Sequence, residues 1–134
     1  MEALNILYVG DAQHSDLRSQ LSAYAPDSYI MQPQELHEAL AMYVLYFPDV
    51  IILEGCSDLV REVYYHLASG VTQASPQSPE AFIVIADGAR WPTPANALLT
   101  QLPAQTNIDT LLAAVEQLRK ATRAQRLAQH PEAA

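Results

Sequence analysis

Short apolar runs alternate with amphipathic segments along this chain. Strong runs occupy residues 5–9, 50–53 and 81–86, and weaker ones occupy residues 28–32 and 98–102. Runs of this length are typical of strands buried on both faces of a parallel sheet. Between them, apolar residues recur at helical spacing, which predicts inward faces formed by Leu17, Leu21 and Tyr24; by Leu36, Leu40, Tyr43 and Val44; by Leu59, Val60, Val63, Tyr64 and Leu67; and by Leu111, Leu112, Val115 and Leu118. The alternation predicts a single α/β domain with helices on both faces of a parallel sheet.

Polar and special residues indicate where the helices begin and end. Ser57 or Asp58 can cap the third helix, and Gly70 follows its last apolar residue. Residues 106–109 have the Thr-x-x-Asp pattern of a capping box, which predicts that Thr106 caps the last helix. Tyr46 and Phe47, at the end of the second helix, are expected to form part of the core and its half-buried rim rather than a recognition surface.

The connection between the fourth and fifth strands is short. Residues 87–101 must supply both a crossover and most of the fifth strand, and they include Pro92 and Pro94. An interior proline costs a helix about 3 kcal/mol, so the fourth helix is expected to be shortened or missing. Its absence would leave apolar surface near Trp91, Leu98 and Leu99, which a protein partner or a second copy of the chain would cover.

Charge is distributed unevenly along the chain. The formal net charge is -8, but residues 119–134 carry four basic residues against one acid, so the rest is about -11. This balance argues against nucleic-acid binding by the domain. We therefore predict a domain over residues 1–120 and, over residues 121–134, a basic helical extension with a disordered tail. The basic side chains of this extension complement the helix macrodipole, or the extension is a linker helix that leads toward an output domain.

The cysteine content and the lack of long apolar segments indicate the cellular compartment. Cys56 is the single cysteine, which excludes an internal disulfide and fits a reducing compartment. No signal peptide and no apolar run long enough to span a bilayer are visible. We therefore expect a cytoplasmic protein without a membrane segment.

Two predicted strands end in acids. The first is followed by Asp11, and the run Pro48-Asp49-Val50-Ile51-Ile52-Leu53 ends at Glu54. The carboxyl ends of parallel strands lie at one edge of the sheet, where ligands and chemistry are found. We therefore expect Asp11 and Glu54 to be neighbours at that edge.

The strand pattern and the Pro-Asp-apolar run resemble those of the response-regulator receiver (CheY-like) family over residues 5–120. The resemblance implies a doubly wound, flavodoxin-like sheet of order 2-1-3-4-5 and a role in two-component signalling. It also implies a phosphoacceptor aspartate, a preceding acid pair, a Thr or Ser, and a Lys-Pro pair. These positions fall here on Glu54, on Gly10-Asp11, on Ala86, and on Leu102-Pro103.

These departures remove most of what phosphotransfer needs. The reaction requires a metal, an aspartate of the correct reach, and donors that hold the phosphoryl product. Glu54 is one methylene too long, and Gly10, Ala86 and Leu102 supply no carboxylate, hydroxyl or ammonium group. We therefore predict a phosphorylation-independent pseudo-receiver, not an enzyme, which uses no cofactor or metal, acts through protein contacts, and keeps Asp11 and Glu54 as relics of an acidic site.

Two alternatives remain. His14 and Cys56 follow the same two strands, so with Asp11 and Glu54 they offer ligands for a transition metal and a weak metal-dependent enzyme. The crevice at the strand ends could instead bind a small molecule as a sensor. Metal titration tests the first alternative, and a ligand thermal-shift screen tests the second.

Overall fold

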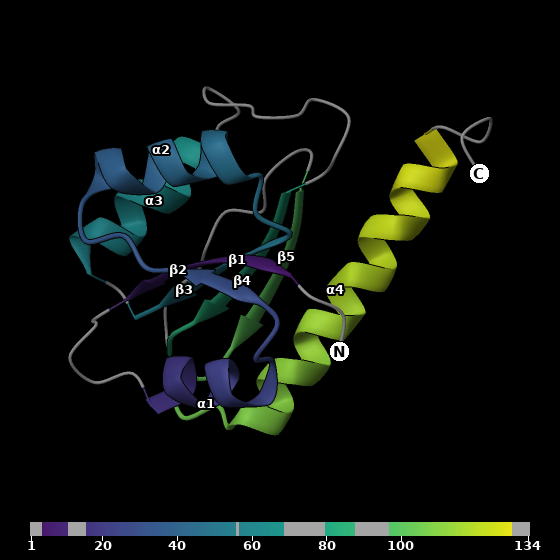
Figure 1. Cartoon of the computed structure of the whole chain (residues 1–134), viewed down its shortest axis with the longest axis horizontal. Helices are drawn as coiled ribbons and strands as arrows, with labels where there is room; N and C mark the ends of the chain where they lie inside the picture. Colours follow the sequence, from purple (N-terminus) through teal and green to yellow (C-terminus); the bar gives the residue numbers. More distant parts are fainter. Residues whose placement is uncertain (1–3, 11–15, 56, 69–79, 88–96, 130–134) are drawn as a thin grey trace.

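The structure is a computed structural model that describes residues 4–10, 16–55, 57–68, 80–87 and 97–129. The five strands are β1 (Asn5–Gly10), β2 (Tyr29–Met31), β3 (Val50–Glu54), β4 (Glu80–Ile85) and β5 (Ala97–Leu102). The four helices are α1 (Asp16–Tyr24), α2 (Leu36–Tyr46), α3 (Asp58–Ala68) and α4 (Ile108–Gln129). The strands form one parallel sheet in the order β2-β1-β3-β4-β5, which confirms the predicted topology (Figure 1).

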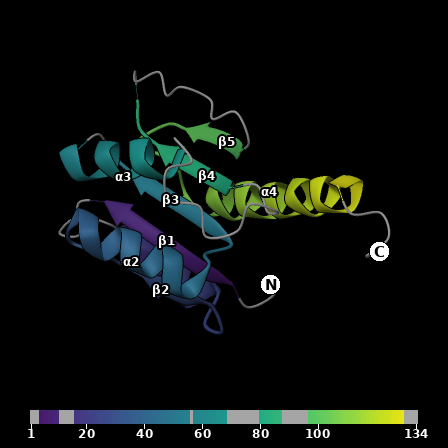
Figure 2. The ribbon, with the colours of Figure 1, turned by 90° about the horizontal axis from the view of Figure 1, so that it is seen from above.

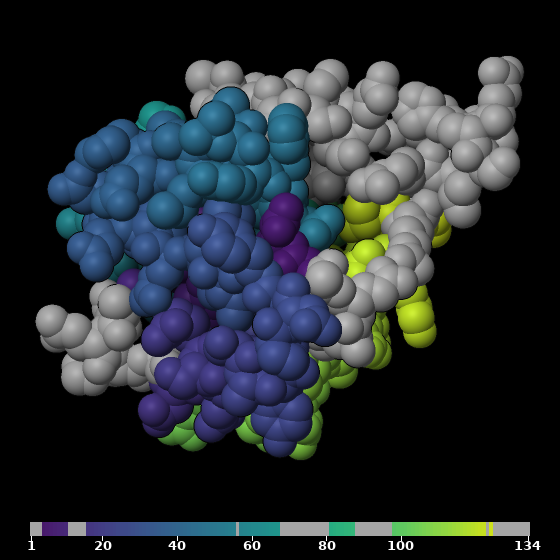
Figure 3. Space-filling view, in the orientation of Figure 1, coloured from purple at the N-terminus to yellow at the C-terminus, as the bar shows by residue number. Residues whose placement is uncertain are grey.

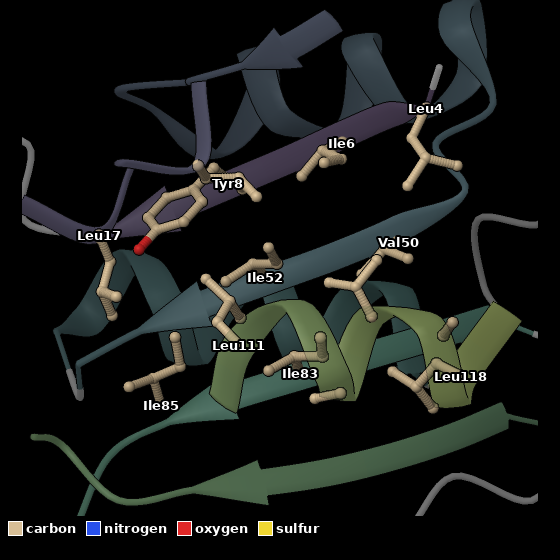
Figure 4. Close-up of a cluster of buried hydrophobic side chains, with 14 residues drawn as sticks. Leu4, Ile6, Tyr8, Leu17, Val50, Ile52, Ile83, Ile85, Leu111 and Leu118 are labelled. Atoms are coloured by element: carbon tan, nitrogen blue, oxygen red, sulfur yellow. The ribbon is translucent and has the colours of Figure 1, made fainter. Parts of the chain in front are cut away.

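The helices cover the sheet in two layers. Helices α1 and α4 lie on one face, and α2 and α3 lie on the other (Figures 1 and 2). Successive residues of each strand enter opposite cores: Ile6 and Tyr8 of β1 pack toward α1 and α4, whereas Leu7 and Val9 pack toward α2 and α3. Figure 4 shows the first of these cores. Burial on both faces explains why the strands have continuous apolar runs.

The core beneath α2 and α3 is rich in aromatic side chains. The ring of Tyr64 meets that of Phe82 edge to face, with centroids 5.3 Å apart. Burial, and secondarily the neighbouring Tyr65, raises the pKa of the Tyr64 hydroxyl above its usual value. All predicted inward residues of α3 are buried except Leu59, which is partly buried.

Two predicted inward residues are exposed instead. Tyr24 is 61% exposed because it is the last residue of α1, and Ala25 turns into the core in its place. Val44 is 45% exposed because it follows the buried Tyr43, and one residue rotates a helix by about 100°. Helix α2 is apolar almost all round, so the pattern alone did not identify its inner face.

The helix caps confirm one prediction and correct another. The hydroxyl of Ser57 accepts a hydrogen bond from the Val60 backbone N–H at 3.3 Å, so Ser57 caps α3. The predicted capping box at Thr106 is wrong. Asn107 Oδ1 accepts the Thr110 N–H at 2.9 Å, while the Thr106 hydroxyl donates to the Pro103 carbonyl at 2.6 Å. Asparagine is a strong N-cap, and it lies immediately before the first helical residue.

The short connection between β4 and β5 leaves the fold with four helices among the described residues, in agreement with the predicted loss or shortening of a helix. Residues 88–96, including Trp91, lie outside the described part of the chain. The last helix, α4, continues without a break across the predicted boundary at residue 120. No helix in the described ranges is long and apolar enough to cross a membrane.

Candidate functional site at the carboxyl edge of the sheet

The register of the sheet gathers the positions that the receiver resemblance singles out. Gly10 pairs with Glu54, Glu54 pairs with Ile85, and Ile85 pairs with Leu102. Ala86 follows Ile85 directly. Gly10, Glu54, Ala86 and Leu102 therefore lie at the carboxyl edge of four adjacent strands, as predicted.

Glu54 is held by the protein rather than projecting freely from this edge. Its side chain is partly buried, and Glu54 Oε1 accepts a hydrogen bond from the Tyr8 hydroxyl at 3.0 Å. Tyr8 itself is 1% exposed, and its hydroxyl points along β1 toward the carboxyl ends of the strands (Figure 4). The hydrogen bond directs the carboxylate toward the core that α1 and α4 cover.

Gly10 lies close to its partner Glu54 on the neighbouring strand β3. A Cβ atom at Gly10 would lie 3.0 Å from both the Cβ and the carbonyl oxygen of Glu54. Atoms at that separation must move apart, and one of them belongs to the backbone. Shortening the Glu54 side chain would leave both of these atoms in place, so any side chain at residue 10 requires Glu54 to shift by a few tenths of an ångström.

The ends of β4 and β5 are joined by internal hydrogen bonds. The Ala86 N–H donates to the Leu102 carbonyl, and the Ala104 N–H donates to Asp87 Oδ1, each at 3.0 Å. The Gly55 N–H donates to the Ile85 carbonyl at 2.9 Å. These contacts engage backbone groups of the strand ends, and Ala86 and Leu102 add no polar side chain. Asp87 was missed as a contributor to this edge, since nothing in its sequence context distinguishes it.

Several predicted site residues lie outside the described part of the chain: Asp11, His14, Cys56 and Trp91. Among the described residues, no three His, Cys, Asp or Glu side chains gather closely enough to hold a metal ion. Leu98 and Leu99 are described, and both are partly buried. Leu98 packs against the core on the α1 and α4 side of the sheet, and Leu99 packs against the core on the other side.

The opposite end of the sheet carries apolar side chains that sequence reasoning did not place at the surface. Among the described residues, the exposed large apolar side chains are concentrated at the β2 edge and the end of α2, namely Tyr29, Val44, Leu45, Tyr46 and Phe47. The signal in the sequence was the uninterrupted apolar run Met42–Phe47 before Pro48, which exceeds what one helix face can bury.

Comparison with solved structures identifies the fold. The chain superposes on NtrX from Brucella abortus (TM-score 0.65, 17% identity), covering 95% of this chain and 28% of NtrX. It superposes on the receiver domain of a putative LuxO repressor from Vibrio parahaemolyticus (0.64, 16%), covering 95% and 98% of the two chains. It also matches the receiver domain of a modulated diguanylate cyclase from Desulfovibrio desulfuricans (0.60, 16%), covering 92% and 98%.

The fold is therefore that of a receiver (CheY-like) domain. The likeness rests on structure, because no protein-family model matches the sequence and no curated protein matches it significantly.

Proposed function

We propose that this chain is a receiver-like domain that acts in signal transduction through protein contacts and without phosphorylation. The observation that carries the proposal is the carboxyl edge of the sheet. The acceptor position holds a glutamate hydrogen-bonded to Tyr8, and the first position of the acid pair holds Gly10, where a side chain would crowd Glu54. The hydroxyl and ammonium positions hold Ala86 and Leu102.

A phosphoryl group on Glu54 would find few groups to stabilise it. Its charge needs a metal or cationic donors nearby, because an uncompensated anion at a partly buried position is costly. The single lysine of the chain, Lys120, lies far along α4, past the turns that pack on the sheet. Asp11 remains as a potential metal ligand, but one carboxylate is too few for an octahedral Mg²⁺ site when Glu54 already accepts a hydrogen bond from Tyr8.

The proposal includes the contact surface predicted from the sequence. Strand β5 is an edge of the sheet, and Leu98 and Leu99 project from its two faces with part of each side chain exposed. An edge strand offers unpaired backbone groups that a partner can bind. A protein partner or a second copy of the chain that docks on Leu98, Leu99 and Trp91 would recognise the domain in its unphosphorylated form.

Mass spectrometry after incubation with acetyl phosphate and Mg²⁺ tests this proposal. The mass of the protein is expected to stay unchanged, while a receiver domain with a complete phosphorylation site, treated in parallel, gains a phosphate. The variant Glu54→Asp is a matched control. It restores the acceptor but none of the other groups, so it is expected to remain unmodified as well. A hydroxylamine-sensitive phosphate adduct on Glu54 would refute the proposal.

A second measurement addresses the metal. Calorimetric titration with Mg²⁺ is expected to show no binding at low-millimolar concentrations, and beryllofluoride is expected to leave the melting temperature unchanged. Micromolar binding of Zn²⁺ that is lost in both His14→Ala and Cys56→Ser would favour the alternative mixed-ligand site instead.

A further inference from the structure

A cluster of exposed apolar side chains marks the amino end of the sheet, opposite to the site described above. We call it the α2 patch and define it by Tyr29, Val44, Leu45, Tyr46 and Phe47, which are between 45% and 68% exposed. The rings of Tyr29 and Tyr46 lie 6.1 Å apart, so the strand and the helix contribute to one surface. In the space-filling view the β2 edge faces the reader, with α2 above it (Figure 3).

Hydrogen bonds fix the α2 patch to the sheet. The Asn5 side-chain amide donates to the Tyr46 carbonyl at 3.0 Å, and Asp49 Oδ2 accepts the Asn5 N–H at 2.8 Å. The Tyr29 N–H donates to the Leu4 carbonyl at 2.7 Å. The patch is therefore built into the start of β1, and a partner would bind it at little cost in ordering the backbone.

Phe47 occupies an unusual backbone conformation. It ends α2 with a φ of 49°, in the left-handed region, where glycine or asparagine is usual. A bulky residue there costs about 1–2 kcal/mol, and burial does not compensate, because the side chain is 57% exposed. The Phe47 N–H donates to the Tyr43 carbonyl at 3.2 Å, so the left-handed residue ends α2 just before Pro48 and fixes the exposed ring at the edge of the patch.

The segment that contains the α2 patch has strongly one-sided charge. Residues 19–50 include four acids and neither lysine nor arginine. Asp27 is exposed in the turn just before Tyr29. Glu38 lies two helical turns before Leu45, on the same side of α2. An occupant of the patch must therefore combine apolar contacts with positive charge.

The distal part of α4 offers this combination. Its basic residues are Arg119, Lys120, Arg123 and Arg126, and alanines lie between them. In two perpendicular views this part of the helix extends past the amino ends of the strands, at the end of the molecule that carries the α2 patch (Figures 1 and 2). Helix α4 packs on the opposite face of the sheet from α2.

We propose that the α2 patch is a self-association surface whose occupant is the basic distal part of α4 from a second copy of this chain. Because the patch and the helix end lie at the same end of the molecule, a twofold axis there lets each copy supply its helix to the other. Such an isologous dimer forms two equivalent contacts. This goes beyond the proposed function, since it holds whether or not Glu54 is phosphorylated, and it leaves the β5 edge available to another protein.

Reciprocal charge reversal tests this arrangement by sedimentation equilibrium. One variant carries Lys120→Glu and Arg123→Glu, and the other carries Asp27→Lys and Glu38→Lys. Wild type is expected to dimerise, more weakly at high salt because the ionic contacts are screened. Each variant alone is expected to dimerise at least about tenfold more weakly. An equimolar mixture of the two is expected to form heterodimers, because both contacts again pair opposite charges.

Two single variants locate the surface independently. Leu45→Glu is expected to abolish dimerisation, whereas Tyr65→Glu, which places an acid at a comparably exposed position on α3, is expected to leave it intact. A wild type that stays monomeric at high micromolar concentration overturns the inference. A dimer that survives Leu45→Glu, or a variant mixture that fails to associate, overturns it too. None of these outcomes bears on phosphorylation, which the acetyl phosphate experiment tests separately.

Discussion

The two ends of the parallel sheet differ in how their side chains are used. At the carboxyl end, the Glu54 carboxylate accepts a hydrogen bond from the Tyr8 hydroxyl, and the Asp87 carboxylate accepts one from the Ala104 N–H. Gly10 lies so close to Glu54 that a Cβ atom there would be 3.0 Å from it. At the amino end, the α2 patch leaves Leu45 and Phe47 largely in solvent. Side chains at the carboxyl end are engaged with one another, whereas those of the α2 patch are exposed.

This contrast makes opposite predictions for mutations at the two ends. Changes at the carboxyl end should lower the free energy of unfolding, because the groups there satisfy one another. Changes at the amino end should leave stability nearly unaltered, or raise it, and alter association instead.

The largest effect is expected for Gly10→Asp. A side chain there meets Glu54 at 3.0 Å, and overpacking of this kind costs about 1–3 kcal/mol. Urea denaturation measures the loss, and Gly10→Ala serves as a control that adds only the Cβ atom. The double variant Gly10→Asp/Glu54→Asp is expected to be no more stable than Gly10→Asp, because the backbone contact remains. An unchanged unfolding midpoint for Gly10→Asp would show that this edge is open.

The hydrogen bond between Tyr8 and Glu54 should give the next largest effect. A double-mutant cycle with Tyr8→Phe and Glu54→Ala is expected to show a coupling of about 1 kcal/mol. The cycle isolates this pair from the other contacts of Tyr8. Glu54→Gln retains an acceptor oxygen, so it should keep part of the coupling. A coupling free energy near zero would show that the Glu54 carboxylate is solvated and gains nothing from Tyr8.

At Phe47 a substitution is expected to raise the free energy of unfolding instead of lowering it. Phe47→Gly removes the penalty of the left-handed conformation, so stability is expected to rise by about 1 kcal/mol relative to Phe47→Ala, which keeps a Cβ atom at φ 49°. Thermal and urea unfolding of both variants measure the difference. Equal stability of the glycine and alanine variants would mean that the backbone there is not strained.

The smallest effect on stability is expected at Leu45. Its side chain is 68% exposed, so Leu45→Gln should change the free energy of unfolding by less than about 0.5 kcal/mol. The matched control is Leu53→Ala in the buried strand β3, which is expected to cost about 2–5 kcal/mol. A large loss of stability in Leu45→Gln would show that this leucine belongs to the core rather than to an interaction surface.

The sequence predicted the strands because burial on both faces leaves a continuous apolar run, as in Val50–Leu53. The order of the strands in the sheet followed from the resemblance to receiver domains and not from the runs themselves. It predicted that the ends of the first and third strands meet at the carboxyl edge because parallel strands deliver their ends together, and Gly10 does pair with Glu54 there, while Asp11 lies outside the described residues. It also predicted the inner face of α3, where apolar and polar residues separate cleanly.

The tertiary structure decided what local pattern could not. Helix α2 is apolar nearly all round, so only its packing on the sheet shows that Tyr43 is buried while Val44 and Leu45 are exposed. The partners of Glu54 and Asp87 lie far away along the chain, and no spacing rule connects residues that meet only when strands assemble. Periodicity records which face of an element is buried, whereas contacts between distant segments exist only once the sheet has formed.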